Sequence, residues 1–352
     1  MKMSKIKMKK MISLLCSTGM AAALLAGCAS SSTSQASGSQ SESVAAVEPV
    51  DVDVMALKGP TAMGMVEFMD ESDNGKIEEN NYTFSIVGAP DEVSGALAKG
   101  DTDIAAVPAN LASVLYNNTD GGVEVLAINT LGVLYIVENG DAIHSVEDLK
   151  GKTIYASGKG STPEYALNYI LEQNGIDPQN DVTIEWKSEH AECLAALIAD
   201  ENGVALLPQP FVTTAQTKNE NIRTALDLTE EWDKLQENNA NPSSLITGVV
   251  VARKDFIDEN PSAVEDFLKH YEKSVDYVNS NVDAAAALVG AYDIVPEAVA
   301  KKAIPECNIV FIDGTDMKDQ LSGYLEVLNE QNPKSIGGTL PNEDFYYVVE
   351  SK

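Results

Sequence analysis

The chain has 352 residues, with 54 acidic side chains against 24 lysines and arginines, so its net charge at pH 7 is −30. Nucleic-acid binding depends on Lys and Arg contacts to phosphates, and a surface this acidic therefore excludes DNA and RNA as partners. Hydrophobic residues make up 44% of the chain, which is typical of a globular protein, and the length favours two domains.

The N-terminus has the pattern of an export signal over residues 1–27. Five lysines lie within the first ten positions, and the apolar stretch from Met11 to Ala26 is too short and too often interrupted by Ser and Gly to span a bilayer. Leu25-Ala26-Gly27-Cys28 resembles a bacterial lipobox, in which cleavage before the cysteine leaves a thiol that carries a diacylglyceryl group. A chance cysteine after an ordinary signal peptide is the alternative. We expect Cys28 to be lipidated and to anchor the protein to the membrane outside the cytoplasm.

A serine-rich segment, residues 28–49, is predicted to be a flexible tether. The folded part then begins near Val50 and has about 300 residues, enough for two lobes with cores of their own. Two further cysteines, Cys193 and Cys307, lie in this part. Their spacing permits a disulfide without requiring one, and we expect two buried thiols.

From Val50 onward, short apolar runs alternate with helical patterns, which indicates β-α units around a sheet. The first unit has a strand, a Gly/Pro/Thr turn and a methionine-bearing helix; two more strands follow, each before a helix. Asp91 is the predicted N-cap of the first of these two helices. The expected elements are strands at 52–57, 82–87 and 103–107, the turn at 58–61, and helices after 61, after 90 and from about 109.

The same order recurs about one hundred residues later, which predicts a repeated half. Ser188 is the predicted cap of the second helix of this repeat. The expected elements are strands at 153–156, 182–186 and 203–207, a turn at 158–163, and helices at 164–173 and after 188.

Two apolar β-rich runs, Glu124–Thr130 and Gly132–Glu138, are placed to carry the chain from one lobe to the other, and Thr247–Ala252 is placed to carry it back. Two crossings between two lobes define a hinge. The predicted division is therefore lobe 1 at 50–138 plus 245–352 and lobe 2 at 139–244. The segment from Asp255 to about Gln331 is predicted to be mostly helical, with apolar residues at 3.6-residue spacing.

Several motifs resemble the substrate-binding proteins of ABC importers, most closely the branch that serves uptake of nitrate, sulfonates, taurine and thiamine precursors. They are the lipobox at Cys28, Lys58-Gly59-Pro60-Thr61, Gly100–Ala105, Asp148–Ile154 and Ile336–Pro341. The resemblance implies an α/β, two-lobed type II periplasmic-binding-protein fold, in which each lobe is a mixed sheet flanked by helices and a two-strand hinge joins them. It also implies a small-molecule ligand in the cleft, and ABC permease and ATPase subunits as partners.

Enzymatic chemistry has little support in the residues. Gly151-Lys152-Thr153 resembles the end of a phosphate loop, but Val146 stands where that loop needs a glycine. His190 and Cys193 are three residues apart on a predicted helix, and two ligands do not complete a zinc site. We therefore expect no catalytic residues, no cofactor and no metal. An enzyme on the same fold, or a ligand sensor without a dedicated permease, are the alternatives.

A binding function needs only loops at the carboxyl ends of the strands, where helix N-termini can hold an anion. The small and hydroxyl residues of these loops are also ordinary turn and cap residues. The candidate ligand-binding residues are Lys58, Gly59, Thr61, Gly88, Asn110, Asn129, Ser161, Thr162 and Gln209.

The ligand itself is predicted from charge and aromatic content. Only two arginines, Arg223 and Arg253, are present, so a clamp on a multiply charged anion is excluded. Lys58 is the only cation near the expected loops. Trp186 and Trp232 are predicted to lie on a strand and on a surface helix, which disfavours an aromatic cage for a quaternary ammonium group. The expected ligand is a small sulfonate-like or heterocyclic nutrient.

Overall fold

The computed structural model describes residues 49–237 and 243–348. The expected signal peptide, tether and Cys28 lie outside the described residues. No helix in the described part is long and apolar enough to cross a membrane.

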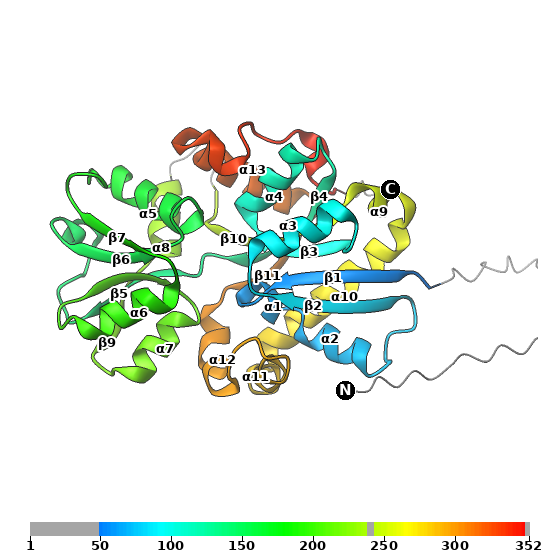
Figure 1. Ribbon diagram of the computed structural model, residues 1–352, viewed down its shortest axis with the longest axis horizontal. Coiled ribbons are helices and arrows are strands. Elements are labelled where there is room, and N and C mark those ends of the chain that lie inside the picture. Colours follow the sequence, from blue (N-terminus) through cyan, green and yellow to red (C-terminus); the bar gives the residue numbers. More distant parts are fainter. Residues whose placement is uncertain (1–48, 238–242, 349–352) are drawn as a thin grey trace, which may run out of the picture. The chain divides into compact units, whose positions relative to one another are not determined.

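The described chain forms two sheets with helices on their faces (Figure 1). The first sheet has the order β11 (Ile309–Asp313), β4 (Val123–Leu131), β10 (Ile246–Arg253), β3 (Ile104–Pro108), β1 (Asp51–Leu57), β2 (Asn81–Val87). The second has the order β7 (Thr183–Lys187), β6 (Thr153–Ser157), β8 (Val204–Pro208), β5 (Leu134–Asn139), β9 (Ile222–Asp227). The expected α/β architecture of two lobes with mixed sheets is confirmed.

Helices connect and cover these strands. In the first lobe they are α1 (Pro60–Met63), α2 (Val66–Asp73), α3 (Pro90–Lys99), α4 (Ala109–Asn118), α9 (Lys254–Glu259), α10 (Pro261–Ser280), α11 (Val282–Ala291), α12 (Glu297–Ala303) and α13 (Gly314–Gln331). In the second they are α5 (Thr162–Gln173), α6 (His190–Ala199), α7 (Phe211–Lys218) and α8 (Leu228–Gln236). Short 3-10 turns lie at η1 (Val146–Leu149), η2 (Ile304–Glu306), η3 (Pro333–Ile336) and η4 (Glu343–Phe345).

The predicted repeat is confirmed by the strand order. In the first sheet β1 pairs in parallel with β2 and β3, and β10 lies antiparallel beside β3. In the second sheet β6 pairs in parallel with β7 and β8, and β5 lies antiparallel beside β8. Strands β10 and β5 are the strands that the chain forms when it arrives from the other lobe, so each crossing ends in an antiparallel pair.

The position of β5 corrects the expected boundary at residue 139. Leu134 pairs with Pro208 and Tyr135 with Asp227, so β5 belongs to the second sheet, whereas the prediction placed residues up to 138 in the first lobe. Only Gly132 and Val133 separate β4 from β5. Both strands are buried apolar runs, and an apolar run alone does not indicate to which sheet it pairs.

The two predicted helix caps are also corrected. Helix α3 is capped at Ala89 and not at Asp91, and α6 at Glu189 and not at Ser188. In both helices a glutamate near the start reaches back to a preceding amide: the Ala89 N–H donates to Glu92 Oε1 (3.2 Å), and the Ser188 N–H to Glu192 Oε2 (2.9 Å). In both helices the glutamate carboxylate thus accepts a hydrogen bond from a backbone amide at the start of the helix that has no partner within the helix.

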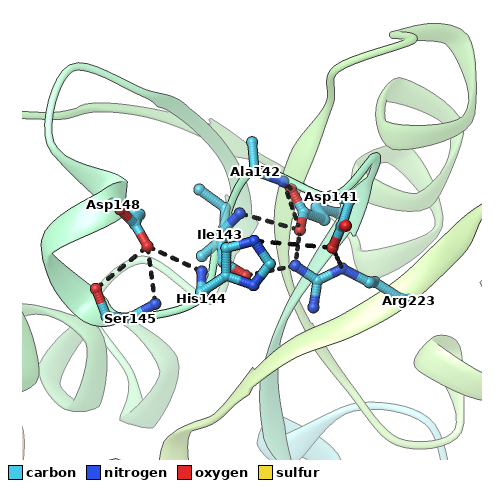
Figure 2. Close-up of polar contacts among 8 residues, drawn as sticks. Asp141, Ala142, Ile143, His144, Ser145, Asp148 and Arg223 are labelled. Carbon is cyan, nitrogen blue, oxygen red and sulfur yellow. Dashed lines mark hydrogen bonds and ion pairs between the residues drawn. The ribbon is translucent and has the colours of Figure 1, made fainter.

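Both arginines form ion pairs near strand ends, and Figure 2 shows Arg223 beside Asp141. Arg223 on β9 forms an ion pair with the buried Glu138 at the end of β5, and its Nε lies 3.1 Å from Asp141 Oδ1. Arg253 at the end of β10 lies 3.1 Å from Asp103. Both arginines are thus paired with carboxylates of the protein itself.

The hydrophobic core crosses from one lobe to the other. One cluster of buried side chains joins Ile154 and Trp232 of the second lobe to Tyr324 of α13. Trp232 is fully buried, which corrects its predicted place on a surface helix. On this side the lobes pack directly against each other.

Candidate functional site

The two lobes together line a cavity of about 460 Å³, called here the apolar cavity. It lies where β1 and β2 end, where α7 begins, and at the connection between α11 and α12. Its lining residues are Lys58, Gly59, Gly88, Pro210, Phe211, Thr214, Ile294, Val295, Pro296 and Val299. Three of the predicted ligand-binding residues, Lys58, Gly59 and Gly88, are thus brought to one cavity.

The first-lobe wall is shaped by the ends of two neighbouring strands. The Lys58 N–H donates to the Val87 carbonyl oxygen (2.9 Å), which holds these ends together. Gly59 has φ 137°, and no atom lies within 4 Å of the position of a Cβ, so a side chain there would strain the backbone and narrow the open space. Lys58 Nζ lies 3.4 Å from the exposed Asp293, and such a surface pair is weak. The ammonium group can therefore turn towards a ligand.

The second-lobe wall is the ring of Phe211. It packs on the imidazole of His190 with 5.2 Å between ring centroids, and His190 Nδ1 lies 2.6 Å from the buried Ser157 Oγ. Burial lowers the pKa of His190, so the imidazole is neutral at pH 7. The Phe211 ring therefore presents an apolar surface to the cavity, and its packing on His190 fixes its position.

Five other predicted residues make internal hydrogen bonds instead of lining the apolar cavity. Thr61 Oγ1 donates to the Leu57 carbonyl, and Asn129 Nδ2 donates to the Thr61 carbonyl (3.3 Å). Asn110 and Thr162 meet across the lobes, with 3.4 Å between Asn110 Oδ1 and Thr162 Oγ1.

The Asn110 side chain, on α4, is engaged in hydrogen bonds within the protein. Asn110 Nδ2 donates to the Ser335 carbonyl oxygen (3.1 Å), and Ser113 and Asn117 of the same helix donate to the Ile336 carbonyl oxygen. These side chains hold the C-terminal segment against α4. Ser161 Oγ in turn donates to the Gly158 carbonyl (2.7 Å), which closes the turn before α5.

The remaining predicted residue, Gln209, lies on the other side of α7. It lines a second cavity of about 420 Å³, called here the Gln209 cavity, together with residues of both lobes. Lys302 also lines it, although no sequence pattern predicted a site there. The sequence likewise did not predict the apolar wall at residues 294–299. Both lie in a helical segment far along the chain, where no local pattern indicates a site.

Among residues 49–237 and 243–348, no group of three His, Cys, Asp or Glu side chains could hold a metal ion. Cys193 and Cys307 are both buried and free. Cys193 Sγ lies 3.6 Å from the Glu189 carbonyl oxygen, as expected for a thiol that packs inside its own helix.

The chain matches the model of a protein family described as ABC-transporter phosphonate periplasmic substrate-binding proteins, over residues 77–293. No curated protein sequence matches it.

Solved structures share the fold over most of their length. An ABC transporter protein from Parabacteroides distasonis has a TM-score of 0.70 at 22% identity, covering 86% of this chain and 99% of its own. The aliphatic sulphonate binding protein SsuA from Escherichia coli has a TM-score of 0.65 at 16% identity, with 84% and 96% covered. The nitrate-binding protein NrtA from Synechocystis has a TM-score of 0.52 at 14% identity, with 72% and 69% covered.

Proposed function

Because this chain belongs to the family of ABC-transporter phosphonate periplasmic substrate-binding proteins, with their two-lobed type II fold, we propose that it captures a small nutrient for import. The observation that supports this most directly is the apolar cavity, to which both lobes contribute walls. A ligand enclosed between two lobes stabilises the closed arrangement that a transporter can recognise. A permease and an ATPase are the proposed partners.

The proposed ligand is a singly charged organic anion with a small apolar body, such as a sulfonate or an acidic heterocycle. Side chains such as Phe211, Val295 and Val299 suit an apolar body, and Lys58 is the one cation among the residues that line this cavity. A multiply charged anion would leave charge unpaired against apolar walls, which is costly.

Replacing Lys58 with glutamine is expected to weaken binding of butanesulfonate about tenfold, because a charge-assisted contact contributes about 1.5 kcal/mol or more. Calorimetric titration measures this, with butanol as the uncharged probe. Lys76→Gln is the matched control, since Lys76 also lies 3.4 Å from an aspartate but does not line the cavity. Equal binding of butanol and butanesulfonate, or equal loss in the control, would refute the proposed ligand class.

We also propose that Cys28 carries the lipid anchor. Cys28→Ala is expected to release the protein from the membrane fraction without changing the melting temperature of the folded part, since the Ser-rich tether contains almost nothing that could build a core. Fractionation of cells followed by immunoblotting measures the release. Retention of the variant in the membrane fraction contradicts the anchor.

Gene neighbourhood distinguishes the proposed role in import from the alternative role as a ligand sensor. A gene for a permease and a gene for an ATPase beside this one support import, and a lone gene beside a membrane receptor supports sensing. Uptake of labelled ligand in cells that lack this protein, with and without the gene restored, then tests import directly.

A further inference from the structure

The Gln209 cavity lies beside the same helix as the apolar cavity but takes different side chains from it. Residues 210, 211 and 214 at the start of α7 line the apolar cavity, whereas 209, 213, 216 and 217 line the Gln209 cavity. This spacing puts the two sets on different faces of the helix. The lining residues of the Gln209 cavity are Tyr135, Gln209, Thr213, Gln216, Thr217, Thr224, Asp227, Lys302 and Glu306.

Both lobes build this cavity, and a hydrogen bond joins them at its edge. Tyr135 on β5 donates its hydroxyl proton to the Glu306 carbonyl oxygen (2.9 Å). Helix α12 of the first lobe packs against α7 of the second. A molecule bound here would contact both lobes.

Gln209 offers the cavity a hydrogen-bond donor with a defined orientation. The residue is only 4% exposed. Its Oε1 accepts from the Thr213 amide (3.3 Å) and from Thr213 Oγ1 (2.9 Å), so the oxygen is identified by its donor partners. In the described part of the chain, Nε2 makes no hydrogen bond. Nε2 does not belong to the buried side-chain atoms that lack a partner, so it is accessible from the cavity that Gln209 lines, where a ligand atom can accept its hydrogen bond.

The charges around the cavity are of both signs. Lys302 Nζ has no carboxylate within ion-pair distance among the described residues, whereas its neighbour Lys301 lies 2.8 Å from Asp283. Asp227 and Glu306 line the same cavity. Asp227 Oδ1 accepts from the Thr229 amide (2.8 Å), which leaves its other oxygen for a further donor.

We propose that the Gln209 cavity is a second ligand site that binds a small zwitterion, an amino acid or an amino-sulfonic acid of similar size. The acidic group of the ligand contacts Lys302 and Gln209 Nε2, and its ammonium group contacts Asp227 and Glu306. A simple anion would face two carboxylates and a simple amine would face Lys302, so a molecule with both charges fits best.

Titration of the full-length protein with glycine, β-alanine and 4-aminobutyrate tests the site, with propionate and propylamine as probes that carry one charge each. At least one zwitterion is expected to bind at least tenfold more tightly than either single-charge probe. Lys302→Gln is expected to weaken that binding tenfold or more. Lys301→Gln is the matched control and is expected to leave it unchanged, because Lys301 does not line the cavity.

A separate variant distinguishes this site from the apolar cavity. Lys58→Gln is expected to leave zwitterion binding unchanged, so the second site can stand even where the proposed sulfonate ligand fails. The proposal is overturned by any of three results: none of the three zwitterions binds, Lys302→Gln binds as the parent does, or the binding depends on Lys58.

Discussion

Replacing Trp232 with alanine is expected to lower the free energy of unfolding by about 3–5 kcal/mol, the usual cost of emptying a large buried aromatic site. Trp232 is fully buried, with its ring 4.6 Å from Tyr169 and 5.7 Å from Tyr324 between centroids. Tyr169 lies on α5 of the second lobe and Tyr324 on α13 of the first. The cavity left by the change would therefore loosen packing within the second lobe and between the lobes.

The indole N–H adds a polar component to this loss. It donates to the Ser243 carbonyl (3.1 Å) and lies 3.2 Å from Ser243 Oγ, so alanine also leaves a buried carbonyl without this donor. Urea unfolding followed by circular dichroism measures the loss. Trp186→Ala is the matched control: Trp186 is partly exposed on β7, and a change there is expected to cost clearly less. Equal losses in the two variants would contradict the assigned burial.

Replacing Arg223 with methionine is expected to lower the free energy of unfolding by about 3 kcal/mol, because it leaves a buried carboxylate without its counter-charge. The Glu138 side chain is only 3% exposed. Its oxygens also accept hydrogen bonds from the Ala142 and Ile143 amides at 3.0–3.2 Å. These bonds remain after the change and keep the cost at the low end of the usual range. The loss should be measured by urea unfolding at pH 7.

Two further variants test the physical reason for that loss. The double variant Glu138→Gln/Arg223→Met is expected to be more stable than Arg223→Met alone, because no unpaired charge remains buried. Lys234→Gln removes an exposed pair with Glu231 and is expected to change stability by only about 0.5 kcal/mol. A double variant less stable than the single one would show that charge burial is not the cause.

The local elements follow from short-range signals in the sequence. The strands at Asp51–Leu57, Asn81–Val87 and Ile104–Pro108 were predicted within one or two residues, because apolar runs bounded by Gly, Pro and Asp are complete signals in themselves. The apolar positions of α10 that recur at 3.6-residue spacing are buried, from Val264 to Val278. The repeated half was recognisable because each copy has the same order of strands, turns and helices.

The sheet to which a strand belongs, and the residues that surround a cavity, were decided by the tertiary structure. Trp232 was predicted to lie on a surface helix, but aromatic side chains of α5 and α13, from distant parts of the chain, pack against it. Asn110 lies at the start of a helix, as predicted, and Thr162 starts α5, although the prediction placed it in the turn at 158–163. The side chains of these two residues meet each other across the lobes.

The candidate site divides in the same way. Lys58, Gly59 and Gly88 follow strands directly, so the sequence by itself determined their place at one edge of a sheet. Val295 and Val299, on the other wall, and Lys302 in the neighbouring cavity come from the α11–α12 region, more than 200 residues after Lys58. The periodicity of apolar residues indicates only which residues a few positions apart share a face. The contacts around the cavities depend instead on how two lobes with similar folds pack against each other.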